Sequence, residues 1–520
     1  MIPADLVLLN GNVITMNSNM PSAQAIAVKG DRISYVGNNQ EVKQYIGEKT
    51  QVICLEGKTV LPGFIDTHVH VTDYGRMLTW MNLAEVYSVK EIQIHLAERV
   101  KQMVENQWIL GRALNPERLL EKRLPTCQEL DAVSPDNPVV FYCQSGQVCV
   151  VNSKTLKAAK INQQNDPGIE RTLTGEPTGI LRDQATNFVW NIIPEPTQQE
   201  LYTATELALA NFVYLGITSI HWIVLSEAEL PIIQELVETN SLPLRVYLIV
   251  PINLLNLALQ KLKPLENNRF KLGGVILFAD GYLATRTAAL FEPYNDCPVN
   301  QGKLFYQQNE MILLADQIQN AGLQFIIHAV GDRAIQEAIK TIQTIHRNPA
   351  VPRPRIEQAA VLNQQLIQCI KELDLSVSIQ PCVIASEFSV WAAEERLGEK
   401  RAQCLFPIKD LLNCGVLVSA GSDCPMEPLN PLFGVEAAVK REDTQSVSVF
   451  EALQMYTVFA ARAALEVVDK GVIEQDKFAD LAILSNDSVD MSINDFFRGY
   501  VCFTVLGGVV YSKNQGFSLV

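Results

Sequence analysis

The sequence predicts an α/β fold, in which a (β/α)8 barrel of the TIM type is accompanied by a small β-sandwich domain. Three observations lead to this prediction. Short apolar runs alternate with longer helical stretches through the middle of the chain, both ends carry short β-like runs, and a long segment follows the first apolar run. Alternating strands and helices are typical of a parallel sheet, and eight such units close into a barrel.

The two ends of the chain are expected to form one β-sandwich domain. Residues 1–58 contain short β-like runs that are separated by turn dipeptides such as Asn10-Gly11. Residues 471–520 show the same pattern of short β-like runs and turns. Turn residues between such runs are typical of antiparallel strands. We therefore predict that 1–58 and 471–520 come together, with a barrel domain at 59–470 inserted between them.

The middle of the chain supplies the strands and helices of the predicted barrel. Because 71–215 is too long for one loop and one helix, we predict an insertion there, after the first barrel strand, with a strand of its own at 139–143. The expected helices include 200–214, 226–239, 309–321, 332–347 and 363–373. The expected barrel strands are 60–66, 216–221, 244–250, 273–279, 324–328, 355–357, 376–380 and 416–421.

The composition limits the class of protein. The chain has 520 residues, of which 48% are hydrophobic and 19% charged, as in globular proteins with a large core. Its formal net charge is −15, and it has no block of Lys and Arg. Acidic chains are poor partners for nucleic acids and anionic membranes, so we expect neither as a partner.

The cysteines and the N-terminal residues bear on the compartment. The 11 cysteines are scattered and include no CxxC pair, which favours reduced thiols and a cytoplasmic location. Residues 1–16 lack the basic and long apolar regions of a signal peptide. No apolar run reaches the length of a transmembrane helix.

Two histidines, His68 and His70, end the first barrel strand. Side chains alternate along a strand, so both histidines point to the same face. Two imidazoles on one face suit a divalent metal such as zinc. The same pair also occurs as ordinary bonded or exposed histidines, so the spacing alone leaves both interpretations open.

Polar residues also follow the later strands, at the end of the barrel where active sites lie. His328 follows the fifth strand and Asp423 the eighth, while His221 and Asp280 end the second and fourth strands. Four of the six histidines of the chain therefore fall at predicted strand ends. Two interpretations of His221 stay open. It either contacts the substrate or supports a metal ligand, or it has a purely structural role.

These residues lie in motifs that resemble the amidohydrolase superfamily, and most closely its branch of N-substituted formamide deformylases. The resemblance implies a metal-dependent hydrolase on a distorted (β/α)8 barrel. It also implies that His68, His70 and His328 are metal ligands, and that Asp423 is both a ligand and the base that takes a proton from the attacking water. The motifs span 61–70, 111–112, 278–281, 286–288, 328–334, 421–425, 471–473 and 478–484.

The chain departs from this family at several expected ligands. Ile276 stands where the fourth strand usually carries a carboxylated lysine that bridges two metals. Gln358 stands where the sixth strand usually ends in histidine. Gln147 aligns with a further histidine, and Cys382 and Val383 stand where another is frequent. Cys382 or Cys424 offers a thiol nearby, although free cysteines are mostly buried and inert.

The sequence is interpreted as a metal-dependent hydrolase of a C–N bond in a small amide, formamide or cyclic amide. We expect one zinc ion per chain, with manganese or iron as alternatives, and a homodimer as the resemblance implies. Two other functions stay open. One is a mononuclear deaminase of the same superfamily, and the other is a degenerate, non-catalytic member that binds a small molecule.

Overall fold

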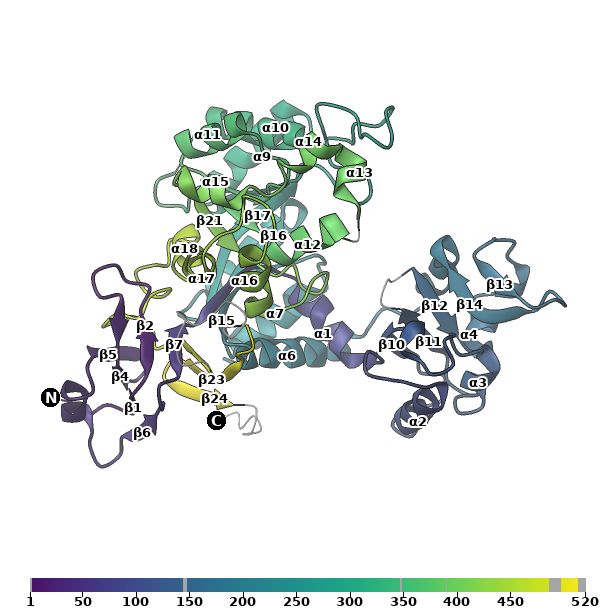
Figure 1. Ribbon diagram of the computed structural model, residues 1–520, viewed down its shortest axis with the longest axis horizontal. Coiled ribbons are helices and arrows are strands. Elements are labelled where there is room, and N and C mark those ends of the chain that lie inside the picture. Colours follow the sequence, from purple (N-terminus) through teal and green to yellow (C-terminus); the bar gives the residue numbers. More distant parts are fainter. Residues whose placement is uncertain (1, 144–146, 347, 390, 486–496, 513–520) are drawn as a thin grey trace. The chain divides into compact units, whose positions relative to one another are not determined.

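The computed structural model describes residues 2–143, 147–346, 348–389, 391–485 and 497–512 (Figure 1). The chain forms two compact units. One comprises Met1–Val71 together with Ala208–Val520, and the other comprises Thr72–Leu207. Within the predicted C-terminal segment, residues 486–496 and 513–520 lie outside the described residues.

Eight parallel strands form the barrel of the first unit, and each pairs with its neighbour in chain order. All eight predicted strands are present, so the predicted fold class is confirmed. Their apolar side chains are almost completely buried, as expected for strands covered on both faces. The strands are β8 (Phe64–Val69), β15 (Ile217–Ile223), β16 (Arg245–Pro251), β17 (Phe270–Phe278), β18 (Gln324–Ala329), β19 (Arg355–Gln358), β20 (Ser376–Ile379) and β21 (Leu417–Ala420).

The first predicted strand, 60–66, is in fact divided between two sheets. Its first part belongs to β7 (Thr59–Pro62) in a terminal sheet, and the barrel strand β8 begins at Phe64. Gly63 lies at the division, where a Cβ atom would stand 2.1 Å from the Thr218 hydroxyl oxygen. A side chain at this position would prevent β8 from packing against β15.

The barrel closes near the carboxyl ends of its first and last strands. The backbone N–H of Asp423 donates to the carbonyl of His68 at 2.8 Å, and the N–H of His70 donates to the carbonyl of Cys424 at 2.9 Å. These two bonds continue the parallel ladder beyond β21 as a bridge between Val69 and Cys424. Three of the four predicted ligands, His68, His70 and Asp423, thus lie on the closing seam.

Helices follow most strands, and the five predicted helices are all present. They bury one side, as in α10, where Ala334, Ile335, Ala338 and Ile342 recur at helical spacing and are buried. The helices are α6 (Gln198–Tyr214), α7 (Glu229–Glu238), α8 (Leu255–Lys261), α9 (Gln308–Asn320), α10 (Asp332–Thr344), α11 (Gln364–Glu372), α12 (Pro381–Ser389), α13 (Ala393–Leu397), α14 (Glu399–Ala402), α15 (Ile408–Asn413), α16 (Pro431–Val439), α17 (Val449–Met455) and α18 (Val458–Ala463).

Strands from both ends of the chain share one sheet, as predicted for the β-sandwich. β7 pairs with β2 from the N-terminal segment on one side and with β22 from the C-terminal segment on the other. A second sheet in the order β5-β4-β1-β6 packs against it through Leu6, Leu8, Ile26, Leu481 and Ile483. The strands are β1 (Leu6–Leu9), β2 (Asn12–Ile14), β3 (Ser22–Ala23), β4 (Ala25–Lys29), β5 (Arg32–Gly37), β6 (Gln51–Cys54), β22 (Leu481–Leu484), β23 (Val501–Leu506) and β24 (Val509–Ser512).

The unit Thr72–Leu207 holds a mixed six-stranded sheet, so the insertion after the first barrel strand has the structure of its own that was predicted. Apolar clusters cover both faces of this sheet. Its strands are β9 (Met81–Asn82), β10 (Ile109–Leu114), β11 (Val139–Cys143), β12 (Val148–Val151), β13 (Ile169–Arg171) and β14 (Pro177–Arg182). Its helices are α1 (Val71–Thr79), α2 (Val89–Val100), α3 (Cys127–Asp131), α4 (Ser153–Ala158) and α5 (Asn187–Trp190). Among the described residues, no helix has the length and apolar content needed to cross a bilayer.

A buried ion pair joins the barrel to the terminal sheet. Arg245 at the start of β16 donates to both carboxylate oxygens of Asp480, at 2.6 and 3.1 Å, just before β22. Asp480 also accepts the N–H of Gly507 at 2.9 Å. Both side chains are at most 5% exposed, so each charge depends on the other for compensation.

Asp480→Ala is therefore expected to lower the free energy of unfolding by about 3–5 kcal/mol, because it leaves a buried guanidinium without a counter-ion. Urea unfolding followed by circular dichroism measures the change. Asp5→Ala is the matched control, since Asp5 pairs with Lys29 at 2.7 Å on the surface, where such pairs contribute up to about 1 kcal/mol. Equal shifts of the unfolding midpoint in both variants would contradict the role given to Asp480.

Candidate metal centre

Three of the four predicted ligands converge at the closing seam of the barrel. Each of His68, His70 and Asp423 offers a donor atom, and these atoms all lie within 4.8 Å of one another. The Nε2 atoms of His68 and His70 each stand 3.5 Å from Oδ1 of Asp423. In the described part of the chain, this is the group of His, Cys, Asp and Glu side chains close enough to hold a metal ion.

The backbone brings these three side chains together. His68 and His70 are two residues apart along an extended segment, so both face the same way. Asp423 has a left-handed φ of 60°, a conformation that Asp tolerates better than most residues. Gly421 allows the segment to approach β8, because a Cβ atom there would lie 2.4 Å from the His68 backbone nitrogen.

Glu357 fixes the orientation of the His68 ring. The Nδ1 atom of His68 lies 2.9 Å from Oε2 of Glu357, and this leaves Nε2 free on the side of Asp423. Burial alone would raise the pKa of Glu357, but the charges of Arg355 and His68 lower it to about 2. Glu357 is therefore an acceptor at neutral pH, and His68 must donate from Nδ1.

Arg355 and His221 support Glu357 from inside the barrel. The Arg355 guanidinium lies 2.5 Å from Oε1 of Glu357 and donates from Nη1 to Nδ1 of His221 at 2.7 Å. Burial and the positive charge of Arg355 hold the pKa of His221 well below its usual range. His221 is thus a neutral acceptor inside the barrel, which favours the structural interpretation over contact with a substrate.

A backbone carbonyl fixes the orientation of His70. Its Nδ1 atom donates to the carbonyl of Ile223, at the end of β15, at 3.1 Å. A carbonyl only accepts, so Nδ1 carries a proton, and Nε2 faces Asp423. The Nε2 atoms of both histidines therefore face the same carboxylate oxygen.

His328, the fourth predicted ligand, stands apart from this group. It is 1% exposed, and neither ring nitrogen has a hydrogen-bond partner. The rings of Phe278 and Tyr282 lie 5.2 and 5.3 Å from its own. Burial, and then the charge of His68, lower the pKa of His328 to about 4, so the ring is neutral and its lone pair is available.

An ionised Asp423 completes the set. Burial raises its pKa, but the charges of His68 and His70 outweigh burial and hold the pKa below its usual range. Two oriented imidazoles, one carboxylate and a buried imidazole without a partner are the donor types that a divalent transition metal prefers. The unsatisfied nitrogens of His328 are the specific sign of a missing partner, because buried polar atoms are otherwise hydrogen-bonded.

Comparison with known proteins identifies the family of this chain. Residues 51–511 match the sequence profile of the amidohydrolase family. The chain belongs to the amidohydrolase family. It is 31% identical over 537 residues to protein LONG AFTER FAR-RED 3 of Arabidopsis thaliana, covering 98% of this chain and 91% of that protein. It is 26% identical over 543 residues to the N-substituted formamide deformylase of Arthrobacter pascens, covering 98% and 99%.

A solved amidohydrolase-like structure agrees with this assignment. A crystal structure described as an uncharacterized metal-dependent hydrolase from Pyrococcus furiosus is similar, with a TM-score of 0.74 and 29% identity. The match covers 92% of this chain and 98% of that one. The family match and this likeness support a hydrolase of the amidohydrolase superfamily.

Within the amidohydrolase family, the departures at the fourth and sixth strands change the character of the site. Ile276 on β17 is buried in an apolar cluster with Tyr247, Ile249 and Ile326, so no ligand is offered there. Gln358 does reach the site, where its Nε2 donates to Oδ2 of Asp423 at 3.4 Å. It therefore acts as a donor to the carboxylate and not as a metal ligand in this arrangement.

The remaining candidate positions add no ligand to the group. Burial raises the pKa of the Cys382 thiol to about 12, so it is protonated at neutral pH and is not a thiolate ligand. Cys424 contributes its backbone carbonyl to the seam. Gln147 lies in the unit Thr72–Leu207, where its carbonyl accepts the N–H of Asp183. Asp280 accepts the N–H groups of Ala289, Val330 and Gly331 and so anchors the loop after β17.

Three residues that matter to the site were not recognised from the sequence. Arg355 and Glu357 alternate on a buried strand, and charged side chains in such a place signal an internal ion pair. Asp66 accepts the N–H groups of His68 and Ser422 at 3.1 and 3.0 Å, and burial raises its pKa to about 6. Asp66 thereby ties β8 to the segment that carries Asp423.

Glu357→Gln is expected to weaken zinc binding roughly 10- to 100-fold, because an amide no longer holds the His68 ring by a charged acceptor. Competition with a chromophoric chelator measures the affinity. Glu229→Gln is the matched control, since Glu229 is also buried but accepts from the Trp222 indole at 3.1 Å and not from a ring of the ligand group. Unchanged zinc affinity in Glu357→Gln would show that Glu357 does not position His68.

Proposed function

We propose that this chain is a metal-dependent hydrolase of a C–N bond in a small amide, formamide or cyclic amide. The observation that carries the proposal is the convergence of the His68 and His70 Nε2 atoms on Oδ1 of Asp423, with both ring orientations fixed by other groups. The similarity to an N-substituted formamide deformylase favours a C–N bond as the target.

His68, His70 and Asp423 would hold the ion, with His328 as a further ligand from β18. A divalent ion in such a site lowers the pKa of a water molecule and polarises a carbonyl group. Zinc is the ion that this mixture of imidazole and carboxylate donors suits best, and manganese and iron accept the same donors.

Asp423 is the proposed base. It is ionised at neutral pH, and Gln358 restrains its Oδ2 atom by a hydrogen bond at 3.4 Å. Such a carboxylate accepts a proton from the attacking water and later delivers it to the leaving nitrogen. Its pKa lies below the usual range, so it is ionised before that transfer.

We also propose a single metal ion per chain. Ile276 replaces the bridging lysine of the family, and Gln358 donates to Asp423 in place of a histidine ligand. A second ion would have too few ligands and no shared anion to screen its repulsion from the first.

Elemental analysis of dialysed protein tests the site and its stoichiometry. We expect about one metal per chain, by the ligand count of catalytic zinc sites. His68→Ala should lose most of this metal because it removes a ligand. His95→Ala should retain it, because His95 is an exposed residue of α2, outside the group of ligands. Two metals per chain would refute the single-ion proposal, and equal metal in the two variants would refute the site.

Asp423→Asn tests the base. We expect the variant to fold but to lose at least about 100-fold in kcat, because the amide cannot accept a proton. The assay follows amine, formate or ammonia release from a panel of N-substituted formamides, amides and cyclic amides after loading with zinc, manganese or iron. Asp316→Asn, in helix α9, is the control that should keep full activity. Normal turnover by Asp423→Asn would show that Asp423 is not the base.

The losses at Ile276 and Gln358 favour one other function, a small-molecule binder without catalysis. The same panel distinguishes the two functions. A metal-loaded protein that binds amides but releases no product would be such a binder. Release of ammonia from an aminated ring compound added to the panel would instead identify a deaminase of the same superfamily.

A further inference from the structure

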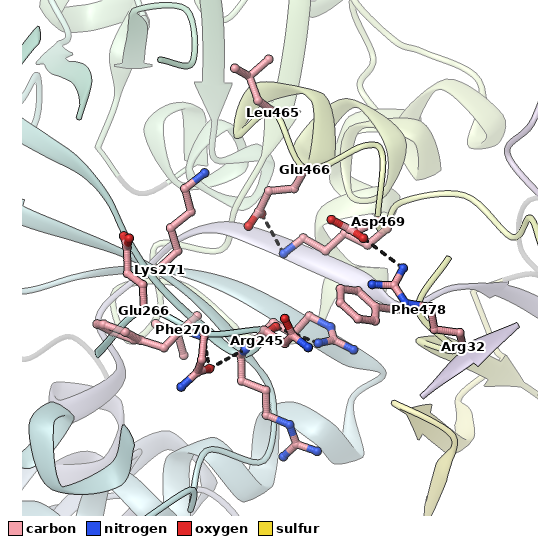
Figure 2. A pocket seen from close by; sticks show the side chains of 14 residues that line it. Arg32, Arg245, Glu266, Phe270, Lys271, Leu465, Glu466, Asp469 and Phe478 are labelled. Atoms are coloured by element: carbon pink, nitrogen blue, oxygen red, sulfur yellow. Dashed lines mark hydrogen bonds and ion pairs between the residues drawn. The ribbon is translucent and has the colours of Figure 1, made fainter. Parts of the chain in front are cut away.

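The sheet β5-β4-β1-β6 has two edges, and among the residues that the structure describes the chain closes one of them. At the β5 edge, Arg32 forms an antiparallel bridge with Phe478, and the N–H of Ile33 donates to the carbonyl of Lys477 at 2.9 Å. The guanidinium of Arg32 also pairs with Asp469 at 3.0 Å and lies over the Phe478 ring (Figure 2). This edge is therefore fastened to the rest of its unit.

The opposite edge of the same sheet is the strand β6 (Figure 1). β6 is the last strand in the order of the sheet and pairs along one side with β1. The N–H groups of Gln51 and Leu55 donate to carbonyls on the β1 side at 2.9 and 2.8 Å. Successive residues of a strand direct their backbone groups to opposite sides, so Val52 and Cys54 present theirs outward. No strand of the described part of the chain pairs with β6 on that outer side.

β6 lacks the features that usually keep a strand edge free of partners. Its four side chains are Gln, Val, Ile and Cys, so neither a charge nor a proline opposes the approach of another strand. The Val52 side chain is 44% exposed. An uncharged edge with outward backbone donors and acceptors is a surface to which a further strand adds.

Further exposed apolar side chains lie beside the start of β6. The hydroxyl of Thr50 donates to the carbonyl of Ala4 at 2.6 Å, and the N–H of Ala4 donates to the carbonyl of Tyr45 at 2.8 Å. Near these contacts, Ile2 and Ile46 are 75% and 39% exposed. Burial of these side chains by a partner would stabilise association through the hydrophobic effect.

We propose that β6 is the contact strand of a homodimer, in which it pairs antiparallel with β6 of a second copy about a two-fold axis. A second copy is the occupant because an antiparallel strand edge is complementary to itself under such an axis. Although the chain carries a net charge of −15, the uncharged β6 brings no like charges opposite one another. The two sheets would then form one continuous sheet.

The backbone selects one register for this pairing. If Val52 stands opposite Cys54 of the second copy, each such pair exchanges two hydrogen bonds, and every outward backbone group of β6 is used. If Val52 stands opposite its own counterpart, Cys54 faces Thr50, whose N–H already donates to the carbonyl of Gly47 at 3.1 Å. The Cys54 carbonyl would then lack a donor. The first register is therefore the proposed one, and it places Ile53 opposite its own counterpart.

Sedimentation velocity of the full chain over a range of concentrations tests the interface. We expect a reversible dimer of twice the 57.8 kDa chain mass, and a weak one because the contact is small. V52K/C54K should need at least about tenfold higher concentrations to dimerise, because it sets like charges opposite one another. V104K/L120K is the matched control, since it adds the same charge at two exposed apolar positions of the unit Thr72–Leu207 and should dimerise normally. Circular dichroism checks that both variants fold.

Oxidative cross-linking followed on a non-reducing gel tests the register. I53C/C54S opposes two thiols in a non-hydrogen-bonded pair, where the Cα atoms lie about 4.5 Å apart, within reach of a disulfide. We expect this variant to form a cross-linked dimer. V52C/C54S opposes its new thiols only in the other register and should form no more cross-linked dimer than the unchanged protein.

Four results would overturn the proposal. A monomer at every concentration of the unchanged protein would exclude the dimer. Equal effects of V52K/C54K and V104K/L120K would place the interface elsewhere. Absence of cross-linking in I53C/C54S would exclude the strand pairing in this register, and cross-linking of V52C/C54S in its place would assign the other register.

Discussion

The closing seam of the barrel is the constraint on which the metal centre depends. The hydrogen bonds that join His68 to Asp423 and His70 to Cys424 complete the ring of strands, and the same residues carry the donor groups. Asp66 strengthens the seam by accepting from both sides of it. Ligand geometry and barrel closure are therefore one structural feature, and a change in the seam alters both.

The interior of the barrel holds a row of charged and polar groups that would be costly if they were isolated. A carboxylate or guanidinium without a partner in such a place costs several kcal/mol. Here Glu357 lies between Arg355 and His68, and Arg355 lies between Glu357 and His221, so each charge has an opposite or accepting neighbour. This row of contacts fixes the orientation of the His68 ring, and a fixed ring orientation favours metal binding by imidazole.

The sequence allowed the barrel to be predicted in detail because its signals are local. Apolar runs marked all eight strands, and helical periodicity marked α6, α7, α9, α10 and α11. The error at the first strand arose because 59–65 is one mostly apolar run, whereas the change from one sheet to the other occurs at Gly63, which packs closely against Thr218. That contact cannot be predicted from the pattern of apolar residues alone.

The site was predictable only as far as its residues follow strand ends. His68, His70 and Asp423 met this condition, and so did His328, although the structure leaves it outside the close group. The roles of Arg355 and Glu357 depend on which side chains face one another across neighbouring strands. The donor role of Gln358 likewise depends on its meeting Asp423, which is 65 positions away in the sequence.

The sheet shared by both ends of the chain has a consequence for biosynthesis. β7 acquires its neighbour β22 only after nearly the whole chain has left the ribosome, whereas every strand of the unit Thr72–Leu207 is encoded in one continuous stretch. During translation, β7 therefore presents an unpaired strand edge of the kind that other chains add to. We expect the nascent chain to need protection at this edge by chaperones until its C-terminal strands arrive.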